Sequence, residues 1–345
     1  MSSSAPQPFA TAPQTTHRLP RLGFAGIGWI GRHRLGAIAR AGAARIAAVC
    51  DPALPRSGPI EGAGLETART TSYPELLEMD LDGVVLATPS ALHAVQAVAA
   101  LERGLAVFCQ KPLGRNAAET RRVVDAACAA DRLLGVDLSY RATAGMRAIR
   151  QLVRDGALGE VYAVELVFHN AYGPDKPWFY DARLAGGGCL LDLGIHLVDL
   201  ALWVLGFPQV TRAHGELLAQ GRPWQSSTGG VEDYAAGQLV LETGATVQLA
   251  CSWKAPAGCN ARIEATFFGT RAGAIFRNLN GSFYDFAAEL LRPDRSREPL
   301  APAADDWGGR MAVEWAVRLA RQPNYAPQIR HVVDVADAID RLYHA

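Results

Sequence analysis

Hydrophobic and polar positions follow one pattern in the first 140 residues of the chain. Short apolar runs alternate there with segments of helical periodicity. Strands are expected at 22–25, 45–50, 83–88, 105–109 and 133–138, and helices at 30–41, 91–103 and 117–130. Apolar strands separated by amphipathic helices are typical of βαβ units. We therefore expect a doubly wound parallel sheet in this part of the chain.

The pattern changes after residue 140. Segments that alternate with period two lie at 160–168, 234–242, 245–253, 262–268 and 272–278, and helices are expected at 146–154, 190–205, 311–320 and 332–343. Alternation of this kind is typical of strands with one buried face. The second part of the chain is thus expected to form a mostly antiparallel open sheet of at least five strands, with helices on one face.

Length and charge narrow the range of functions. A chain of 345 residues is long enough for about two domains. We assign them to 21–141 and 142–345 and expect 1–20, rich in Ser, Ala and Pro, to be a disordered tail. Lys plus Arg and Asp plus Glu both number 34, which argues against nucleic-acid binding and a polybasic membrane anchor. With no apolar stretch of membrane-spanning length, a cytoplasmic location is expected.

A glycine-rich turn follows the first expected strand and opens the first helix. It reads Gly26-Ile27-Gly28-Trp29-Ile30-Gly31, and Asp51 ends the next strand, 20 residues beyond Gly31. This context favours a dinucleotide site, with the pyrophosphate at the helix N-terminus and Asp51 on the ribose hydroxyls. Trp29 is expected to pack against the sheet or the cofactor. The alternative is a tight turn that binds no ligand.

Two further strand ends carry polar residues. Thr88-Pro89-Ser90 with His93 follows one strand, and Gln110-Lys111-Pro112 follows the next. Ligands of open α/β sheets bind at the carboxyl ends of strands, so both stretches are expected to touch the nicotinamide half of the cofactor. Ser90 could instead cap the following helix, and His93 could be a solvated helix residue.

A polar stripe interrupts the most apolar helix of the chain. Asp192, His196 and Asp199 are spaced as on one helical face, directly after three glycines at 186–188 that we expect to leave room for a ligand. An Asp one turn from a His can orient it as a general acid or base. A structural Asp–His pair and a metal site remain as alternatives. The six cysteines show no zinc-binding spacing, so no metal is expected.

Together these motifs resemble the Gfo/Idh/MocA family of oxidoreductases. The resemblance rests on the glycine-rich turn, on the motifs at 88–93 and 111–112, and on Gly187-Gly188 followed by Asp192-x-Gly194-x-His196. It implies an N-terminal Rossmann domain and a C-terminal α/β domain whose large sheet serves oligomer contacts. It further implies NAD, or else NADP, as the cofactor and a hydride transfer to or from a sugar, cyclitol or related polyol.

The resemblance also assigns roles to individual residues. Lys111, Asp192 and His196 are expected to be catalytic and to touch the substrate. Further substrate contacts are expected from the loop at 169–180 and from five residues: Tyr140, Arg141, Trp178, Tyr180 and Arg183. The carboxylate of Asp51 favours NAD over NADP, because it repels a 2′-phosphate.

The chain departs from the family at one cofactor-site position. Where the family usually has Glu-Lys-Pro, this chain has Gln110-Lys111-Pro112, and it therefore lacks a negative charge beside Lys111. Two other functions remain open. One is a glycosidase or lyase that oxidises its substrate transiently with a retained NAD, and the other is a non-catalytic dinucleotide sensor. A homodimer or homotetramer formed through the C-terminal sheet is expected, with no nucleic-acid or membrane partner.

Overall fold

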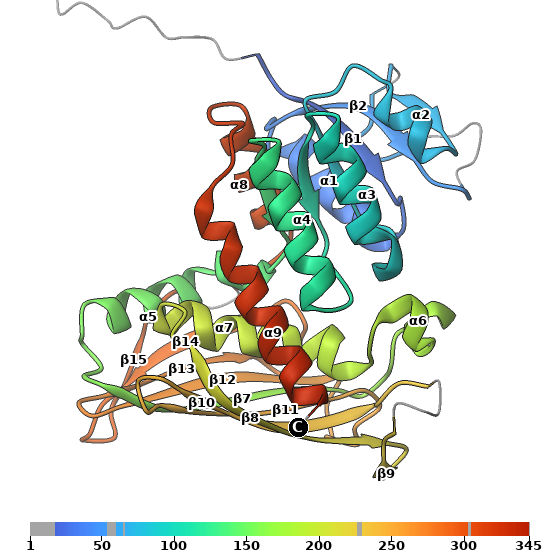
Figure 1. The fold of residues 1–345 in the computed structure, drawn as a ribbon. Coiled ribbons are helices and arrows are strands. Elements are labelled where there is room, and N and C mark those ends of the chain that lie inside the picture. Colours follow the sequence, from blue (N-terminus) through green and yellow to red (C-terminus); the bar gives the residue numbers. More distant parts are fainter. Residues whose placement is uncertain (1–17, 54–59, 65, 226–229, 303–304, 345) are drawn as a thin grey trace, which may run out of the picture.

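The computed structural model describes residues 18–53, 60–64, 66–225, 230–302 and 305–344. Most of the expected N-terminal tail and part of the loop at 52–59 lie outside these residues. Two layered parts are visible in Figure 1. A parallel sheet flanked by helices lies above a broad sheet that carries helices on its upper face.

The first sheet has six strands in the order β3-β2-β1-β4-β5-β6, all parallel. Its strands are β1 (Arg21–Ala25), β2 (Arg45–Cys50), β3 (Ala68–Thr70), β4 (Gly83–Leu86), β5 (Ala106–Cys109) and β6 (Leu134–Val136). The central strands β4 and β5 are buried on both faces, which explains their continuous apolar sequence. This order reverses between β1 and β4, and ligands of doubly wound folds bind at that point. The predicted fold class is confirmed.

Four helices connect these strands: α1 (Trp29–Arg40), α2 (Tyr73–Leu77), α3 (Ser90–Glu102) and α4 (Ala117–Ala129). The start of α4 shows how local sequence sets these boundaries. The Asn116 side chain accepts a hydrogen bond from the backbone N–H of Glu119, and Glu119 places a negative charge in the first turn. Asp340, from the far end of the chain, accepts a further bond from the Ala117 N–H.

The second sheet has nine strands in the order β15-β14-β13-β12-β7-β11-β10-β8-β9. Only the β7–β11 pair is parallel. The strands are β7 (Val161–Asn170), β8 (Val210–Ala219), β9 (Arg222–Pro223), β10 (Tyr234–Leu241), β11 (Thr246–Ser252), β12 (Ala261–Gly269), β13 (Gly273–Asn278), β14 (Phe286–Leu291) and β15 (Arg297–Pro299). The mostly antiparallel sheet is therefore as predicted, and its nine strands exceed the five that were expected as a minimum.

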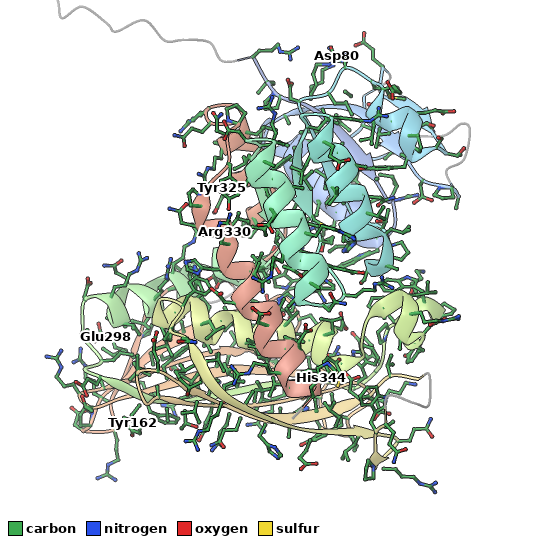
Figure 2. The ribbon with its side chains drawn as sticks, in the orientation of Figure 1. Asp80, Tyr162, Glu298, Tyr325, Arg330 and His344 are labelled. Carbon is green, nitrogen blue, oxygen red and sulfur yellow. The ribbon has the colours of Figure 1, made fainter. Side chains whose placement is uncertain are left out.

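Helices cover one face of this large sheet. They are α5 (Ala144–Arg154), α6 (Ala182–Ala185), α7 (Ile195–Leu205) and α9 (His331–Tyr343), and α8 (Arg310–Leu319) precedes α9. Figure 1 shows α5, α7 and α9 on the upper face. Tyr162, 56% exposed, points away from the helices on the other side (Figure 2).

One helical stretch, Ala182–Leu205, is long and apolar enough to cross a membrane by length and composition. Within the fold, 89% of its most apolar window is buried. Its apolar residues from Cys189 to Val204 belong to the hydrophobic core between the helices and the large sheet. The apolar character of this stretch is therefore explained by its place in the core.

The C-terminal segment returns to the first part of the molecule. Trp315 of α8 packs against Phe108 of β5, with ring centroids 5.6 Å apart, and Val332 and Val333 join the core on the other side of the parallel sheet. The range 142–345, expected to form the second domain, therefore contributes α8 and the start of α9 to the first.

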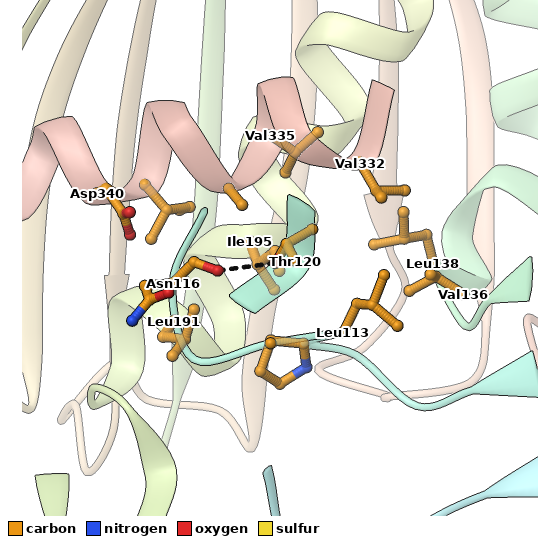
Figure 3. Close-up of a pocket in the computed structure, with 14 residues that line it drawn as sticks. Leu113, Asn116, Thr120, Val136, Leu138, Leu191, Ile195, Val332, Val335 and Asp340 are labelled. Carbon is orange, nitrogen blue, oxygen red and sulfur yellow. Dashed lines mark hydrogen bonds between the residues drawn. The ribbon is translucent and has the colours of Figure 1, made fainter. Parts of the chain in front are cut away.

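Helix α9 also joins the two domains. Figure 3 shows its side chains facing both parts of the molecule across an apolar gap of about 20 Å³. Apolar residues lining this gap are Leu113, Val136 and Leu138 of the first domain, Leu191 and Ile195 of the second, and Val332 and Val335 of α9. This packing fixes the strand ends of the first sheet relative to the helix that follows residue 190.

Candidate active site

A pocket of about 840 Å³ lies where the two domains meet. The residues expected to bind the cofactor line it, with the exception of Gly31. Those lining it are Gly26, Gly28, Trp29, Ile30, Asp51, Thr88, Pro89, Ser90, His93, Gln110 and Lys111. They belong to the carboxyl ends of β1, β2, β4 and β5, as the strand-end rule predicts.

The three glycines of the turn have different roles. Gly26 has φ +89°, and a Cβ there would lie 2.4 Å from the carbonyl oxygen of Ala87. A Cβ on Gly31 would lie 2.0 Å from the carbonyl oxygen of Gly26. At Gly28, the residue before α1, a Cβ would meet no protein atom within 4 Å. Gly26 and Gly31 therefore close the turn, while Gly28 borders open space that a pyrophosphate can fill.

Asp51 supports the turn from the end of β2. Its Oδ2 accepts a hydrogen bond from the Ile27 N–H at 2.8 Å, and its Oδ1 accepts one from the Ala53 N–H at 2.9 Å. An ionised carboxylate has about four acceptor sites, so both oxygens can still accept hydroxyl protons. Asp51 thus fits the hydroxyls of a ribose. Arg56, which could contact a 2′-phosphate, lies outside the described residues.

His93 joins two strand ends. Its side chain is buried, with Nδ1 2.7 Å from the carbonyl oxygen of Pro112 and Nε2 2.7 Å from that of Thr88. Burial lowers the pKa of His93, against the two carbonyl contacts, which raise it. The alternative of a solvated helix residue is wrong. Ser90 is the first residue of α3, and the capping position before it is held by Pro89.

Gln110 belongs to a buried polar network that the sequence reasoning missed. The Nε2 of Gln110 and the Nε of Arg34 both donate to Oδ2 of Asp137, each at 2.5 Å. Among the described residues, the buried Oδ1 of Asp137 has no partner. A Glu at position 110 would set a second carboxylate against Asp137, so the neutral amide suits this chain. Arg34 could have been suspected, because it interrupts the apolar face of its helix.

Lys111 and Asp192 meet across the domain boundary. The Lys111 Nζ donates to Oδ1 of Asp192 at 2.6 Å and to the Asp192 carbonyl oxygen at 2.7 Å. The Trp253 Nε1 donates to the other carboxylate oxygen at 3.1 Å. Both partners of the ion pair keep part of their side chain exposed, 19% for Lys111 and 17% for Asp192. The pair is therefore open to a ligand in the pocket.

His196 lies beside this pair and lines the same pocket. It is 8% exposed, and its ring meets the edge of Tyr140 with centroids 5.0 Å apart. Burial, followed by the charges of Lys111 and Arg34, lowers the pKa of His196 well below its usual range. The imidazole is therefore neutral at pH 7 and able to accept a proton. No described residue hydrogen-bonds its ring nitrogens, so Asp192 orients Lys111 here rather than His196.

The expected stripe of three polar residues is divided in the structure. A π-helical turn spans Leu190–Gly194, and α7 begins only at Ile195. The wider turn lies before His196, and His196 and Asp199 both belong to α7. Asp199 is instead bound by Arg141, whose Nε donates to Oδ2 at 2.8 Å. Asp192 and His196 line the pocket and Asp199 does not, so two of the three residues of the predicted stripe belong to the candidate site.

The glycines before this turn accommodate the protein's own atoms. A Cβ on Gly188 would lie 1.9 Å from the carbonyl oxygen of Glu232, and one on Gly187 would lie 2.1 Å from the Tyr343 hydroxyl. The buried Glu232 carboxylate accepts bonds from the N–H groups of Gly188 and Leu190 and from the Tyr343 hydroxyl. At Gly188 the close approach expected of a ligand is thus made by Glu232, which fixes the start of the π-helical turn, whereas Gly187 also lines the pocket.

The expected substrate residues fall into two groups. Tyr140 and Trp178 line the pocket together with the catalytic candidates. Arg141, Tyr180 and Arg183 do not: Arg141 pairs with Asp199, the Tyr180 hydroxyl donates to the Pro174 carbonyl, and Arg183 extends into solvent beside Asp181. A cation or an aromatic ring near the pocket in sequence was therefore not enough to predict a substrate contact.

Other pocket residues were not singled out from the sequence. They include Asn170, Tyr172, Phe283, Tyr284 and Trp307. Asn170 and Tyr172 lie within the predicted loop at 169–180, which was expected to contact the substrate, so the sequence predicted their segment. The other three come from segments that only the tertiary structure brings to the pocket. No three His, Cys, Asp or Glu side chains of the described residues gather as a metal site.

Family models match most of the chain. Residues 21–138 match the model described as the oxidoreductase family with an NAD-binding Rossmann fold. Residues 146–275 match the GFO/IDH/MocA C-terminal domain. The two matches follow the two sheets seen in the structure.

Curated relatives and a solved structure agree with these matches. D-Glucoside 3-dehydrogenase of Escherichia coli is 30% identical, over 72% of this chain and 76% of that protein. A putative UDP-kanosamine synthase oxidoreductase subunit of Amycolatopsis mediterranei is 34% identical, over 68% of each chain. The structure of a levoglucosan dehydrogenase in complex with NADH and levoglucosan has a TM-score of 0.78 at 20% identity, and the match covers 94% of this chain and 96% of that one.

Proposed function

Because the chain belongs to the GFO/IDH/MocA family of NAD-binding oxidoreductases, we propose that it oxidises a hydroxyl of a sugar, cyclitol or related polyol, or reduces the corresponding carbonyl. The reaction takes place beside Lys111, Asp192 and His196. The observation that carries this proposal is the 2.6 Å contact between Lys111 of the first domain and Asp192 of the second, in a pocket that also contains the glycine-rich turn.

The pocket suits a nicotinamide dinucleotide along its length. Open space at Gly28 and the N-terminus of α1 fit the pyrophosphate, and Asp51 fits the ribose hydroxyls. The strand-end residues at 88–93 and 110–111 then border the nicotinamide half. Bound dinucleotide supplies the hydride acceptor for oxidation and the hydride donor for reduction. Asp51 favours NAD, since its charge repels a 2′-phosphate.

Lys111 acts on the reacting oxygen of the substrate. An ammonium group has three donors, and Asp192 accepts two of them, through its carboxylate and its carbonyl oxygen. The third donor is left for the oxygen that gains negative charge as the hydroxyl loses its proton. Asp192, itself held by Trp253, fixes the direction of that donor.

His196 takes the proton from the reacting hydroxyl. It is suited to this role because burial and neighbouring cations keep its imidazole neutral at pH 7. In the reverse direction the protonated imidazole returns the proton to the forming alcohol. The edge of the Tyr140 ring restricts the ring of His196 from one side.

A panel of sugars, cyclitols and their glycosides, assayed with NAD and with NADP, tests this proposal directly. We expect reduction of NAD in the presence of at least one of these alcohols, with a higher kcat/KM for NAD than for NADP. A protein that binds NAD but oxidises no polyol, and reduces none of the corresponding ketones, would contradict it.

The proposal includes the cellular location and the oligomeric state of the enzyme. We expect a cytoplasmic homodimer or homotetramer that associates through the large sheet, with no nucleic-acid or membrane partner. The sheet face opposite α5, α7 and α9 is the surface available for this, and Tyr162 belongs to it. Light scattering of the wild-type protein beside a Tyr162→Glu variant measures the oligomeric state, which we expect to fall in the variant.

A further inference from the structure

Four aromatic side chains form a continuous wall of the pocket, which we call the aromatic strip: Tyr172, Phe283, Tyr284 and Trp307. Tyr284 and Trp307 stack with their planes 10° apart and their centroids at 5.8 Å. The ring centroids of Tyr172 and Phe283 lie 5.7 Å apart, and the Trp307 Nε1 donates to the Phe283 carbonyl oxygen at 2.6 Å. The strip is thus a single packed unit built from three separate segments.

The strip leads from the catalytic histidine to the mouth of the pocket. Tyr140 connects His196 to the strip, because the centroid of its ring lies 5.0 Å from that of His196 and 6.2 Å from that of Trp307. Exposure rises along this path, from 8% at His196 and 6% at Tyr140 to 43% at Tyr284 and 54% at Tyr172. A ligand whose reacting ring lies at His196 therefore extends outward along aromatic faces.

Such exposed rings in a pocket point to an apolar partner. Large apolar side chains are costly to leave in water, and clusters of them in a concave site mark ligand contacts. Flat rings stack on tyrosine and tryptophan, and the gain exceeds that of the buried area alone. The position of the strip, beyond the reacting ring, assigns it to the part of a substrate that is not oxidised.

The charges in the described part of the pocket favour a neutral group over a phosphate on that part. Three cations line the pocket in the described residues, and each is paired with a carboxylate (Arg34–Asp137, 2.5 Å; Lys111–Asp192, 2.6 Å; Lys176–Asp175, 3.0 Å). A diphosphate needs unpaired Arg or Lys donors, or a helix N-terminus. The N-terminus of α1 is taken by the pyrophosphate of the cofactor in the proposed function.

From these observations we propose that the substrate is a neutral glycoside whose glycosidic substituent is a second ring with an apolar face, either an aryl ring or a further sugar, bound against the aromatic strip. This inference rests on the proposed function, which places the oxidised ring at His196. It adds a binding subsite for the second ring and predicts weaker binding of nucleotide-linked sugars. The aryl ring and the second sugar share one chemical feature, an apolar ring face.

Calorimetry of the NADH-saturated protein tests the subsite without turnover, because a glycoside cannot be oxidised when the cofactor is already reduced. The probes are matched methyl and phenyl glycosides of glucose, galactose and mannose in both anomeric forms, a glucosyl disaccharide, and UDP-glucose. For the accepted sugar, we expect the phenyl glycoside to bind at least about tenfold more tightly than the methyl glycoside. Comparing the affinities of the disaccharide and the phenyl glycoside shows whether the subsite prefers a second sugar or an aryl ring. UDP-glucose should bind no more tightly than the methyl glycoside.

Two variants and a control locate the effect. Tyr284→Ala and Tyr172→Ala remove exposed rings of the strip and should each reduce the phenyl-to-methyl ratio of affinities at least threefold. Val317→Ala is the control, since Val317 is exposed on α8, does not line the pocket and lies outside the large sheet, and the phenyl-to-methyl ratio of this variant should equal that of the wild type. Melting temperatures of the same preparations establish that each protein is folded.

The possible outcomes separate the subsite from the reaction. Equal affinity for phenyl and methyl glycosides, an unchanged ratio in both strip variants, or tightest binding of UDP-glucose would overturn the subsite. Turnover of methyl and phenyl glycosides with equal kcat/KM would do the same while leaving the proposed function intact. Tight binding of phenyl glycosides without any change in the absorbance of reduced nicotinamide would instead overturn the proposed function and keep the subsite.

Discussion

Replacing Gly28 with Val tests the cofactor site, because this glycine borders open space while its neighbours in the turn do not. A Cβ at Gly28 meets no protein atom within 4 Å, and its φ of −69° is accessible to any residue. The added side chain therefore enters the pocket where the pyrophosphate approaches the N-terminus of α1. We expect a folded protein with weakened dinucleotide binding.

The size of the effect follows from the contacts that are lost. Moving the pyrophosphate away from α1 breaks at least one hydrogen bond to a charged group, worth about 1.5–3 kcal/mol. The Kd for NAD should therefore rise about 10- to 150-fold. Val is a poorer residue than Gly before a helix, at a cost of about 1 kcal/mol. The melting temperature should thus fall by only about 2–4 °C.

Isothermal titration calorimetry with NAD and thermal unfolding of the same preparation measure both quantities. Gly26→Ala is the matched comparison, since Gly26 has φ +89° and its Cβ would lie 2.4 Å from the Ala87 carbonyl oxygen. That variant should lose stability rather than affinity alone. A folded Gly28→Val protein that binds NAD as tightly as the wild type would refute the assignment of the turn.

Three further predictions concern the catalytic residues and their surroundings. His196→Asn should lower kcat by roughly 10²–10⁴ with little change in NAD affinity or melting temperature; a destabilised variant with normal turnover would remove His196 from the mechanism. The pKa of His196 is lowered and the base acts in its neutral form, so kcat/KM for oxidation should stay constant as the pH falls through 6.5. Removing a cation in Lys111→Met should move the acid limb of the remaining activity to higher pH; an acid limb at the ordinary imidazole value in the wild type would contradict this. Arg141→Met leaves the buried Asp199 without its partner and should cost about 3–5 kcal/mol in urea unfolding, whereas a stable but inactive variant would return Arg141 to the substrate site.

The sequence predicts the two sheets well, because each has a distinct pattern of burial. Strands buried on both faces, such as β4 and β5, read as continuous apolar runs. The strand β8 was not predicted, since its sequence Val-Thr-Arg-Ala-His-Gly-Glu gives no clear alternation and most of its side chains are partly or fully exposed. Regular helical spacing also failed at 190–194, where a π-helical turn changes which residues share a face.

The sequence predicts the site only where a local rule applies. Polar residues at strand ends line the pocket, because parallel strands bring their carboxyl ends to one edge. Arg141 and Arg183 had suitable chemistry, but their partners Asp199 and Asp181 hold them elsewhere. Tyr284 and Trp307 are brought to the pocket by the course of the chain after β13. Local sequence patterns do not predict that course.

The return of α8 to the first domain has a consequence for synthesis on the ribosome. The N-terminal sheet is translated first, yet Trp315 and its neighbours complete one of its two cores. Until those last residues leave the exit tunnel, the face of the sheet that receives α8 stays uncovered. The first domain is thus translated before the second but completed only after it. A chain that stops before residue 310 should be held by chaperones or degraded rather than accumulate as a truncated dinucleotide-binding protein.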